Sequence, residues 1–197
     1  MRKVDVNFLK GFFSSDSDFA YHILSLDIIN NGIGPEGAKF LSENLKNLTS
    51  LNISDHNIGY EEAKAISSMN QLNTLNIFGN KIGDEGAKFL SSMSQLNTLD
   101  IAWNSIGYEG AKAISSMNQL NTLNITWNNI GVEGAKAISS MNQLNPLNIS
   151  ENYIGDEGAK FLSTMNQLTR LDISRNKIDE NALQALKDAL KTTEING

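Results

Sequence analysis

The chain has 197 residues, with 16 basic and 22 acidic side chains, a net charge of −6 and no cysteine. This acidic balance argues against a nucleic-acid partner, because binding to phosphates depends on clustered lysine and arginine. The lack of cysteine excludes disulfides and thiolate metal sites, and no stretch of about 18 apolar residues predicts a membrane span.

Residues 1–22 are predicted to form an N-terminal cap. Asp5, Asn7 and Lys10 interrupt the apolar stretch that a signal peptide needs, so we expect this segment to stay in the folded chain. The protein is then expected in the cytoplasm, or outside the cell by a route without a classical signal peptide. The apolar residues that would cover the first repeat are Phe8, Leu9, Phe12, Phe13 and Phe19.

Residues 23–178 consist of seven copies of a repeat of about 24 residues. The copies begin at Leu26, Leu51, Leu75, Leu99, Leu123, Leu147 and Leu171. The first copy is one residue longer than the others, and Ile195 begins an eighth copy that stops at Gly197. Self-similarity at this period with regularly spaced leucines predicts a leucine-rich repeat solenoid.

Each copy is predicted to contain one short strand. In the third copy, Leu75 and Ile77 alternate with Thr74, Asn76 and Phe78, which is the pattern of a strand with one buried face. Thr74, Asn76 and Phe78 should then point outward. Stacked copies would form one parallel sheet with strands about 4.8 Å apart.

A turn and a helix are expected after each strand. Asn80 recurs in the other copies except the second, which has His56, and its amide is suited to satisfying backbone groups in the turn. Farther along, Ala87, Leu90 and Met93 have helical spacing and should face the strand. The glycine before each helix is the expected N-cap. Pro35 at the first helical position and Asp179 in place of the last glycine support this placement.

Residues 179–197 are predicted to form the helix of the last repeat and a C-terminal cap. Ala182, Leu186 and Ala189 are expected to face inward. The expected outward residues are Gln184, Lys187, Asp188 and Lys191. A polar outer surface is what a terminal repeat requires.

Residues 99–117, LDIAWNSIGYEGAKAISSM, and the sister copies resemble the ribonuclease-inhibitor-like class of leucine-rich repeats. They are most similar to bacterial GALA-type repeats, with the consensus NxIGDEGAxALA. The resemblance covers residues 23–197 and implies an α/β right-handed horseshoe, with parallel strands on the concave face and helices on the convex face. The class includes inhibitors, GTPase activators and ubiquitin-ligase adaptors, and GALA-like proteins of pathogens are delivered into host cells. The resemblance therefore implies an effector-like binding module rather than an enzyme.

Motifs that suggest chemistry are better explained by the repeat. Residues 32–37 form a GxGxxG motif, but Gly34 and Gly37 are ordinary repeat positions, so we expect no dinucleotide cofactor. His22 and His56 are too few ligands for a transition metal. No histidine stands at a place where it would activate a serine, and we expect no catalytic residue.

The candidate partner site is the outward column that varies most among the copies. This column is Asn30, Asp55, Gly79, Trp103, Trp127, Glu151 and Arg175. Trp103 and Trp127 occupy adjacent copies, with Phe78 one copy earlier, and large aromatic side chains dominate many binding surfaces. Tyr60, Tyr108 and Tyr153 would extend the rim.

Charged and polar residues complete the predicted site. Asp55, Asp100 and Glu151 would surround the aromatic residues with negative charge, while Arg170 and Arg175 form a small positive end. Asn76 and Asn124, with Asp100, belong to a polar column along the strands. We therefore expect a monomer that binds a protein partner with a basic or mixed surface.

Four alternatives remain open from the sequence. Trp103 and Trp127 would also be explained by stacking on each other to shield the sheet edge. They would equally form a platform for carbohydrate, with the Asn/Asp column binding hydroxyl groups. Regulation of a GTPase is permitted by the resemblance, and a consensus-like scaffold without a selected partner is the fourth reading.

Overall fold

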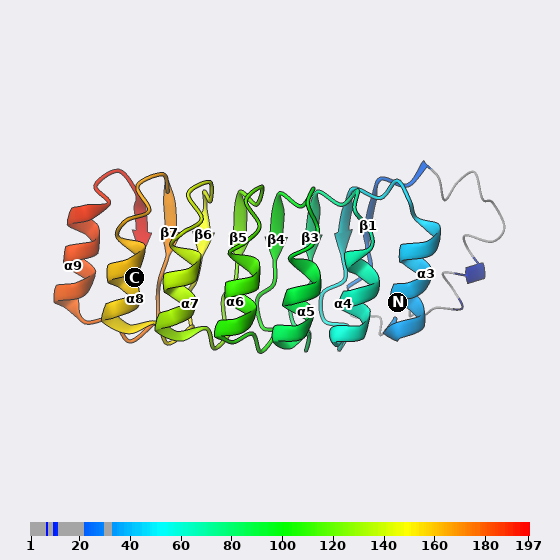
Figure 1. Ribbon diagram of the computed structural model, residues 1–197, viewed down its shortest axis with the longest axis horizontal. Coiled ribbons are helices and arrows are strands. Elements are labelled where there is room, and N and C mark those ends of the chain that lie inside the picture. Colours follow the sequence, from blue (N-terminus) through cyan, green and yellow to red (C-terminus); the bar gives the residue numbers. More distant parts are fainter. Residues whose placement is uncertain (1–6, 8–9, 12–21, 30–32) are drawn as a thin grey trace.

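The computed structural model describes residues 7, 10, 11, 22–29 and 33–197. Figure 1 shows strands and helices alternating in this part of the chain, with the strands in one layer and the helices in another. The strands are β1 (Ser25–Asp27), β2 (Ser50–Asn52), β3 (Thr74–Asn76), β4 (Thr98–Asp100), β5 (Thr122–Asn124), β6 (Leu147–Asn148), β7 (Arg170–Asp172) and β8 (Glu194–Asn196). The helices are α3 (Gly34–Asn44), α4 (Tyr60–Ser67), α5 (Gly83–Leu90), α6 (Tyr108–Ile114), α7 (Gly131–Ile138), α8 (Gly155–Leu162) and α9 (Glu180–Ala189).

The strands form one parallel sheet in the order of the chain, which confirms the predicted solenoid. Neighbouring strands pair at identical repeat positions, so Leu51, Leu75 and Leu99 lie side by side. Strand β6 is one residue shorter because Pro146 has no N–H, whereas Thr122 donates at this position to the carbonyl of Asn97 at 3.0 Å. The apolar residues of the N-terminal cap lie outside the described residues.

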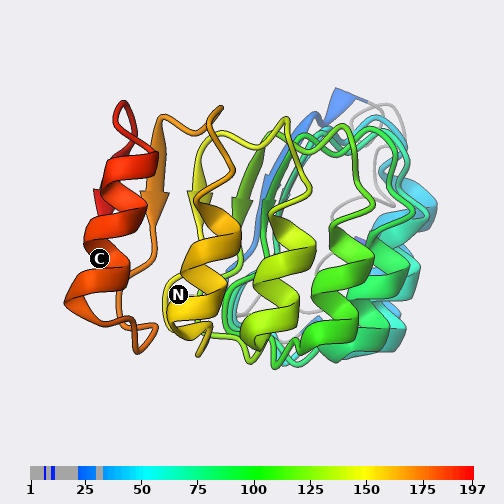
Figure 2. The same cartoon turned by 60° about the vertical axis from the view of Figure 1, so that its left-hand side comes forward.

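The core lies between the two layers. The leucines of the strands and the isoleucines directly after them form one core cluster with the inner residues of the helices, and Figure 2 shows the helices packed along one side of the sheet. The predicted inward residues Ala87, Leu90 and Met93 are all buried. Because each repeat buries its apolar residues against its neighbours, the core is continuous along the stack.

A ladder of buried asparagines holds the turns that leave the strands. The Nδ2 group of Asn80 donates to the carbonyls of Ile77 at 2.9 Å and Ile53 at 3.1 Å. Its Oδ1 accepts from the N–H groups of His56 at 3.1 Å and Ile58 at 2.9 Å. Equivalent donor bonds are made by Asn104, Asn128, Asn152 and Asn176. The predicted role of this asparagine is confirmed, and one side chain bridges consecutive repeats.

His56 takes the place of asparagine in the second copy. Its Nδ1 accepts from the N–H of Ile33 at 3.2 Å, and its Nε2 contacts the carbonyl oxygen of Ile28. Burial of the ring lowers the pKa of His56, although the Ile28 carbonyl and the charge of Asp55 act in the opposite direction. The neutral imidazole is therefore the form that the folded chain favours.

The helix starts follow two geometries, and the expectation of a glycine N-cap was correct for only one of them. Gly59 and Gly107 are N-caps with extended backbone. Ahead of α3, α5, α7 and α8 an isoleucine is the N-cap, and the glycine that follows has a left-handed φ, +59° at Gly83. Glycine is favoured there because it adopts positive φ without steric cost.

The glycine N–H groups have different acceptors: that of Gly59 donates at 3.0 Å to Oε2 of Glu62 in its own helix, whereas Gly83 and Gly107 donate to neighbouring repeats. The left-handed Gly83 donates to the backbone carbonyl of Asn104 in the next repeat, at 3.0 Å. The extended Gly107 donates at 2.7 Å to Oδ1 of Asp84 in the previous repeat, and Gly110 donates to the same atom at 2.9 Å. Asp84 thus caps α6 although it belongs to the previous repeat, and the N-cap residue Gly107 has no side chain that could do so.

The last helix confirms one expectation and corrects another. Asp179 is the N-cap of α9, and its side chain accepts from the N–H of Ala182 at 2.7 Å. However, Ala189 is exposed. The inward residues are Leu183, Leu186 and Leu190 instead of the predicted Ala182, Leu186 and Ala189. Leucine buries more apolar area in the core than alanine does, so the leucines set the rotation of the helix.

Replacing Asn128 by alanine should strongly destabilise the chain. Its amide donates to the carbonyls of Ile101 and Ile125 and accepts from the N–H of Ile106. Loss of these bonds leaves buried backbone groups unpaired, at about 1–3 kcal/mol each. Urea unfolding should therefore show a loss of at least about 2 kcal/mol. Alanine at the exposed neighbour Asn129 is the control and should change stability by less than about 0.5 kcal/mol.

Replacing His56 by asparagine should reduce the loss of stability in mild acid. The folded pKa of His56 is lowered from its ordinary value of 6.5, so below that pH the unfolded chain binds more protons. The stability that neutral His56 provides is complete above pH 6.5 and declines as the pH falls toward the folded pKa. Urea titrations of both chains across this range should show the smaller decline in the variant; equal declines would contradict this origin.

Candidate functional site

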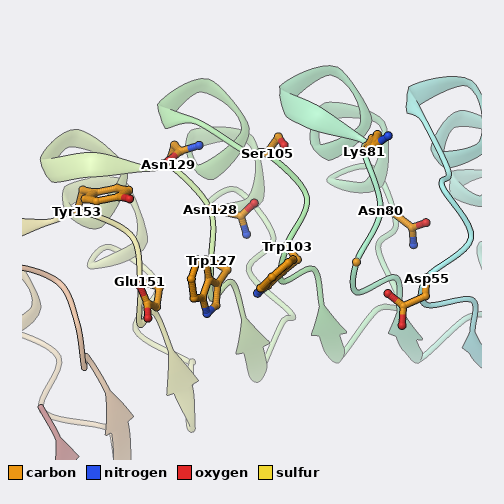
Figure 3. Close-up of a pocket in the computed structure, with 11 residues that line it drawn as sticks. Asp55, Asn80, Lys81, Trp103, Ser105, Trp127, Asn128, Asn129, Glu151 and Tyr153 are labelled. Carbon is orange, nitrogen blue, oxygen red and sulfur yellow. The ribbon is translucent and has the colours of Figure 1, made fainter.

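The loops that leave the strands carry two rows of side chains. The first loop row is Asp55, Gly79, Trp103, Trp127, Glu151 and Arg175, all with φ between +54° and +69°. The second loop row follows two residues later and comprises Asn57, Lys81, Ser105, Asn129, Tyr153 and Lys177. The buried asparagine ladder runs between the two rows. Figure 3 shows the middle of both rows facing a common groove, which has a volume of about 470 Å³.

The two tryptophans form the centre of the groove. Their ring centroids are 4.9 Å apart with an angle of 46° between the planes, and they are 50% and 46% exposed. Phe78 lies next to them, with its ring centroid 6.3 Å from that of Trp103. The expected aromatic cluster is therefore present. It lies on the loops, three residues beyond the last residue of each strand, and not on the strands themselves.

A left-handed backbone is unusual for tryptophan. At Trp103 φ is +57° and at Trp127 it is +54°. For a bulky side chain this conformation costs about 1–2 kcal/mol relative to ordinary backbone. Gly79 occupies the same position in the preceding repeat with a φ of +69°, where its small size avoids this cost.

Acidic residues flank the tryptophans within the first loop row. Asp55 is exposed at one end of the groove, and Glu151 lies beyond Trp127 at the other end. The sequence led us to expect Arg175 in a separate positive end. In the structure it forms a salt bridge instead, with its Nη1 at 2.9 Å from Oε1 of Glu151. The two charges compensate each other. Asp55 is the other acidic residue of the groove, and no described residue forms a salt bridge with it.

Arg170 lies apart from this groove. It belongs to β7 and lines a smaller hollow of about 280 Å³ on the sheet, together with Asn124, Pro146 and Asp172. The structure therefore does not bring Arg170 and Arg175 into one positive end. The dipolar groove expected from the sequence separates into a loop groove and a sheet hollow.

The polar column on the strands supports the loops. Asn76, Asp100 and Asn124 pair in register on β3, β4 and β5. Each Oδ1 accepts the N–H two residues later, at 3.0 Å for Asn76, 3.1 Å for Asp100 and 3.2 Å for Asn124. Asn124 also donates to Oδ2 of Asp100 at 3.0 Å. These side chains thus fix the turn that carries the tryptophans.

Asp100 is the member of this column whose pKa is shifted. Burial raises the pKa of its carboxyl group, although hydrogen bonds from the Ala102 N–H and the Asn124 amide favour the charged carboxylate. The carboxylate lies next to the sheet and its oxygens are used within the protein. Asp100 is therefore a weaker candidate for direct contact with a partner than the exposed Asp55.

The second loop row contains residues that the sequence analysis did not select. Lys81, Ser105 and Asn129 line the groove. Their position also varies from copy to copy, which is the signal that would have identified them. Tyr153 was expected at the rim and does line the groove, with the ammonium of Lys177 4.9 Å from its ring centroid. The other two tyrosines of that expectation, Tyr60 and Tyr108, begin helices and do not line it.

The lining of the groove includes the hydroxyl group of Ser105 but no histidine, so a serine–histidine pair is not present there. Within residues 22–29 and 33–197 no group of three or more histidines and carboxylates is placed to hold a metal ion. Among the helices that the structure describes, none is long and apolar enough to cross a membrane.

Comparison with known proteins supports the architecture. The leucine-rich repeat family matches residues 22–42, 44–67, 69–91, 93–115, 117–139, 143–163 and 165–187. No curated protein shows significant sequence similarity to the chain. An internalin from Listeria monocytogenes has a similar structure, with a TM-score of 0.72 and 25% sequence identity.

The match to the internalin covers 91% of this chain and 49% of the internalin chain, so this protein spans about half the length of that one. The family match extends over most of the residues, and its segments follow the strand–helix units of the structure. The protein belongs to the leucine-rich repeat family.

Proposed function

We propose that the chain is a non-catalytic module that binds a protein partner in the groove between the two loop rows. The observation that carries this proposal is the pair of half-exposed indoles at Trp103 and Trp127. Exposed aromatic side chains of this size in a hollow surface are typical of residues that dominate interfaces. The leucine-rich repeat fold generally mediates interactions between proteins, in agreement with the proposal.

The backbone at the tryptophans supports a role beyond stability. Contact between the rings contributes about 0.5–1.5 kcal/mol, while two left-handed tryptophans cost about 1–2 kcal/mol each. The net effect on folding is therefore close to zero or unfavourable. Side chains that are large, exposed and held at a conformational cost are expected where they serve a function.

The loop rows are also well prepared for binding. Their backbone is held by the asparagine ladder below and by the Asn/Asp column on the strands. A surface that is already ordered loses little conformational entropy on association, so more of the contact energy contributes to affinity. The GALA-type repeat motif supports the finer proposal of a bacterial, effector-like protein.

Carbohydrate binding is a weaker candidate on this geometry. Sugar recognition would need polar groups beside the tryptophan platform that are available to hydroxyl groups. The Oδ1 atoms of Asn76 and Asn124 already accept backbone N–H groups, and the amide of Asn124 donates to Asp100. The Asn/Asp column is thus largely occupied by interactions within the protein.

Replacing Trp103 and Trp127 together by asparagine should abolish partner binding without unfolding the chain. Asparagine tolerates left-handed backbone, so the thermal midpoint should stay close to that of the native chain. Affinity capture from bacterial and eukaryotic lysates, read by mass spectrometry, should show a specific protein retained by the native chain and lost with the variant.

The matched control replaces Tyr60 and Tyr108 by alanine. These exposed aromatic residues begin helices α4 and α6 and lie outside the groove lining. The control should retain the captured protein. Equal capture by the native chain and the tryptophan variant would show that the tryptophans belong to the scaffold and would refute the proposal.

A further inference from the structure

The first loop row contains one ion pair, and its geometry indicates how an external cation could bind elsewhere in the row. Glu151 and Arg175 occupy neighbouring repeats, and the guanidinium of Arg175 lies against the carboxylate of Glu151 at 2.9 Å. Their backbones are joined indirectly by the bond from Glu151 N–H to the carbonyl of Ser174. A carboxylate in one repeat can therefore hold a guanidinium at the equivalent position of the next repeat.

Asp55 and Gly79 stand in the same relation, but the cation is missing. The N–H of Asp55 bonds to the carbonyl of Phe78, as that of Glu151 bonds to Ser174. Gly79 takes the position of Arg175. The carboxylate of Asp55 lies over this glycine, because a Cβ atom built on Gly79 would be 2.1 Å from Oδ1 of Asp55. The Asp55 carboxylate therefore takes the space that a side chain at position 79 would fill. The open part of the groove lies beyond it, between the Asp55 carboxylate and Trp103, and is called the slot below.

An aromatic wall borders the other side of this slot. The backbones of Asp55 and Trp103 are two repeats apart, about 10 Å at the usual strand spacing, and the Asp55 carboxylate reaches over Gly79 into this interval. Figure 3 shows them facing each other across this interval, with the Asp55 carboxylate directed along the row toward the indole. A flat cation held in the interval would contact the carboxylate and the indole at once, which is the arrangement of a cation–π pair supported by a salt bridge.

The charges of the groove favour a cation there. Glu151 is already paired with Arg175, whereas no described residue forms a salt bridge with Asp55. Lys81 also lines the groove, but it belongs to the second loop row, nearer the helices in Figure 3. The net charge of −6 further favours approach of a basic ligand.

We propose that the slot between Asp55 and Trp103 receives an arginine side chain of the partner, with its guanidinium stacked on Trp103 and paired with Asp55. This inference rests on the proposed function and specifies its chemistry. Arginine is assigned instead of lysine because a planar guanidinium matches both a flat ring and a carboxylate. An exposed arginine on an extended segment or loop of the partner would then serve as the anchor of the complex.

Tryptophan fluorescence tests this proposal directly, because Trp103 and Trp127 are the two tryptophans of the chain. The full chain is titrated with acetyl-arginine methylamide and, separately, with acetyl-citrulline methylamide, which has nearly the same shape but no charge. We expect a saturable change with the arginine compound, with a Kd on the order of 1 mM for so small a ligand. The citrulline compound should give no saturable change, and free acetyl-tryptophanamide controls for collisional quenching.

Asp55→Asn should weaken binding of the arginine compound at least about tenfold, since it removes the charge from the ion pair. Asparagine suits the φ of +60° at this position, so the fold should be retained. Glu85→Gln removes one charge from the outer face of α5, where Glu85 pairs with Lys88, and should leave binding unchanged.

Three results would overturn the assignment of arginine: an equal response to citrulline, equally tight binding of acetyl-lysine methylamide, or full binding by Asp55→Asn. These outcomes are separable from failure of the proposed function. Loss of a captured protein with the tryptophan variant, together with no response to the arginine compound, would refute the arginine anchor alone. If the chain responds to the arginine compound but captures no protein whose binding requires the tryptophans, protein docking is refuted and the arginine site is not.

Discussion

The hydrogen bonds of the buried asparagine ladder are the constraint on which the rest of the structure depends. Parallel strands of three residues bury their leucines, but the chain must then turn away while its backbone N–H and C=O groups remain buried. One amide per repeat satisfies these groups and joins each turn to its neighbours, as Asn128 does with Ile101 and Ile106. The backbone of the loops is held in place by these hydrogen bonds.

This constraint also explains why the variable residues of the chain are concentrated in two rows. Within the turn, the ladder position and the apolar positions on either side are committed to folding, so substitution there is costly. The residues between them project outward, and those of the first loop row do so with left-handed backbone. Exchange among aspartate, tryptophan, glutamate and arginine is therefore tolerated in the first loop row, and a binding surface can differ from repeat to repeat on an unchanged frame.

Most of the fold follows from the sequence, because a repeat gives the same signal many times. Several copies have the same residue type at the positions of Leu75, Ala87 and Asn80, so the burial of the first two and the role of the third are predicted repeatedly. The site follows only in part. The ion pair between Glu151 and Arg175 depends on the rotamers of two long side chains, and the conformation of Trp103 depends on how the turn closes. Neither property can be derived from the spacing of residue types. The inward face of α9 was predicted wrongly because alanine and leucine are equally acceptable on an inner helix face.

Asp84 has a consequence for the evolution of the array. Its carboxylate completes the start of a helix that belongs to the following unit, and Asp156 likewise accepts from the N–H of Asp179 at 2.9 Å. Units that look alike in sequence are therefore matched to their successors and are not interchangeable modules. Exchanging the units that begin at Leu75 and Leu123 would place Val132 before Gly107, leaving that N–H without its acceptor. Growth of the array by copying adjacent pairs would preserve the match, whereas shuffling of single units would break it.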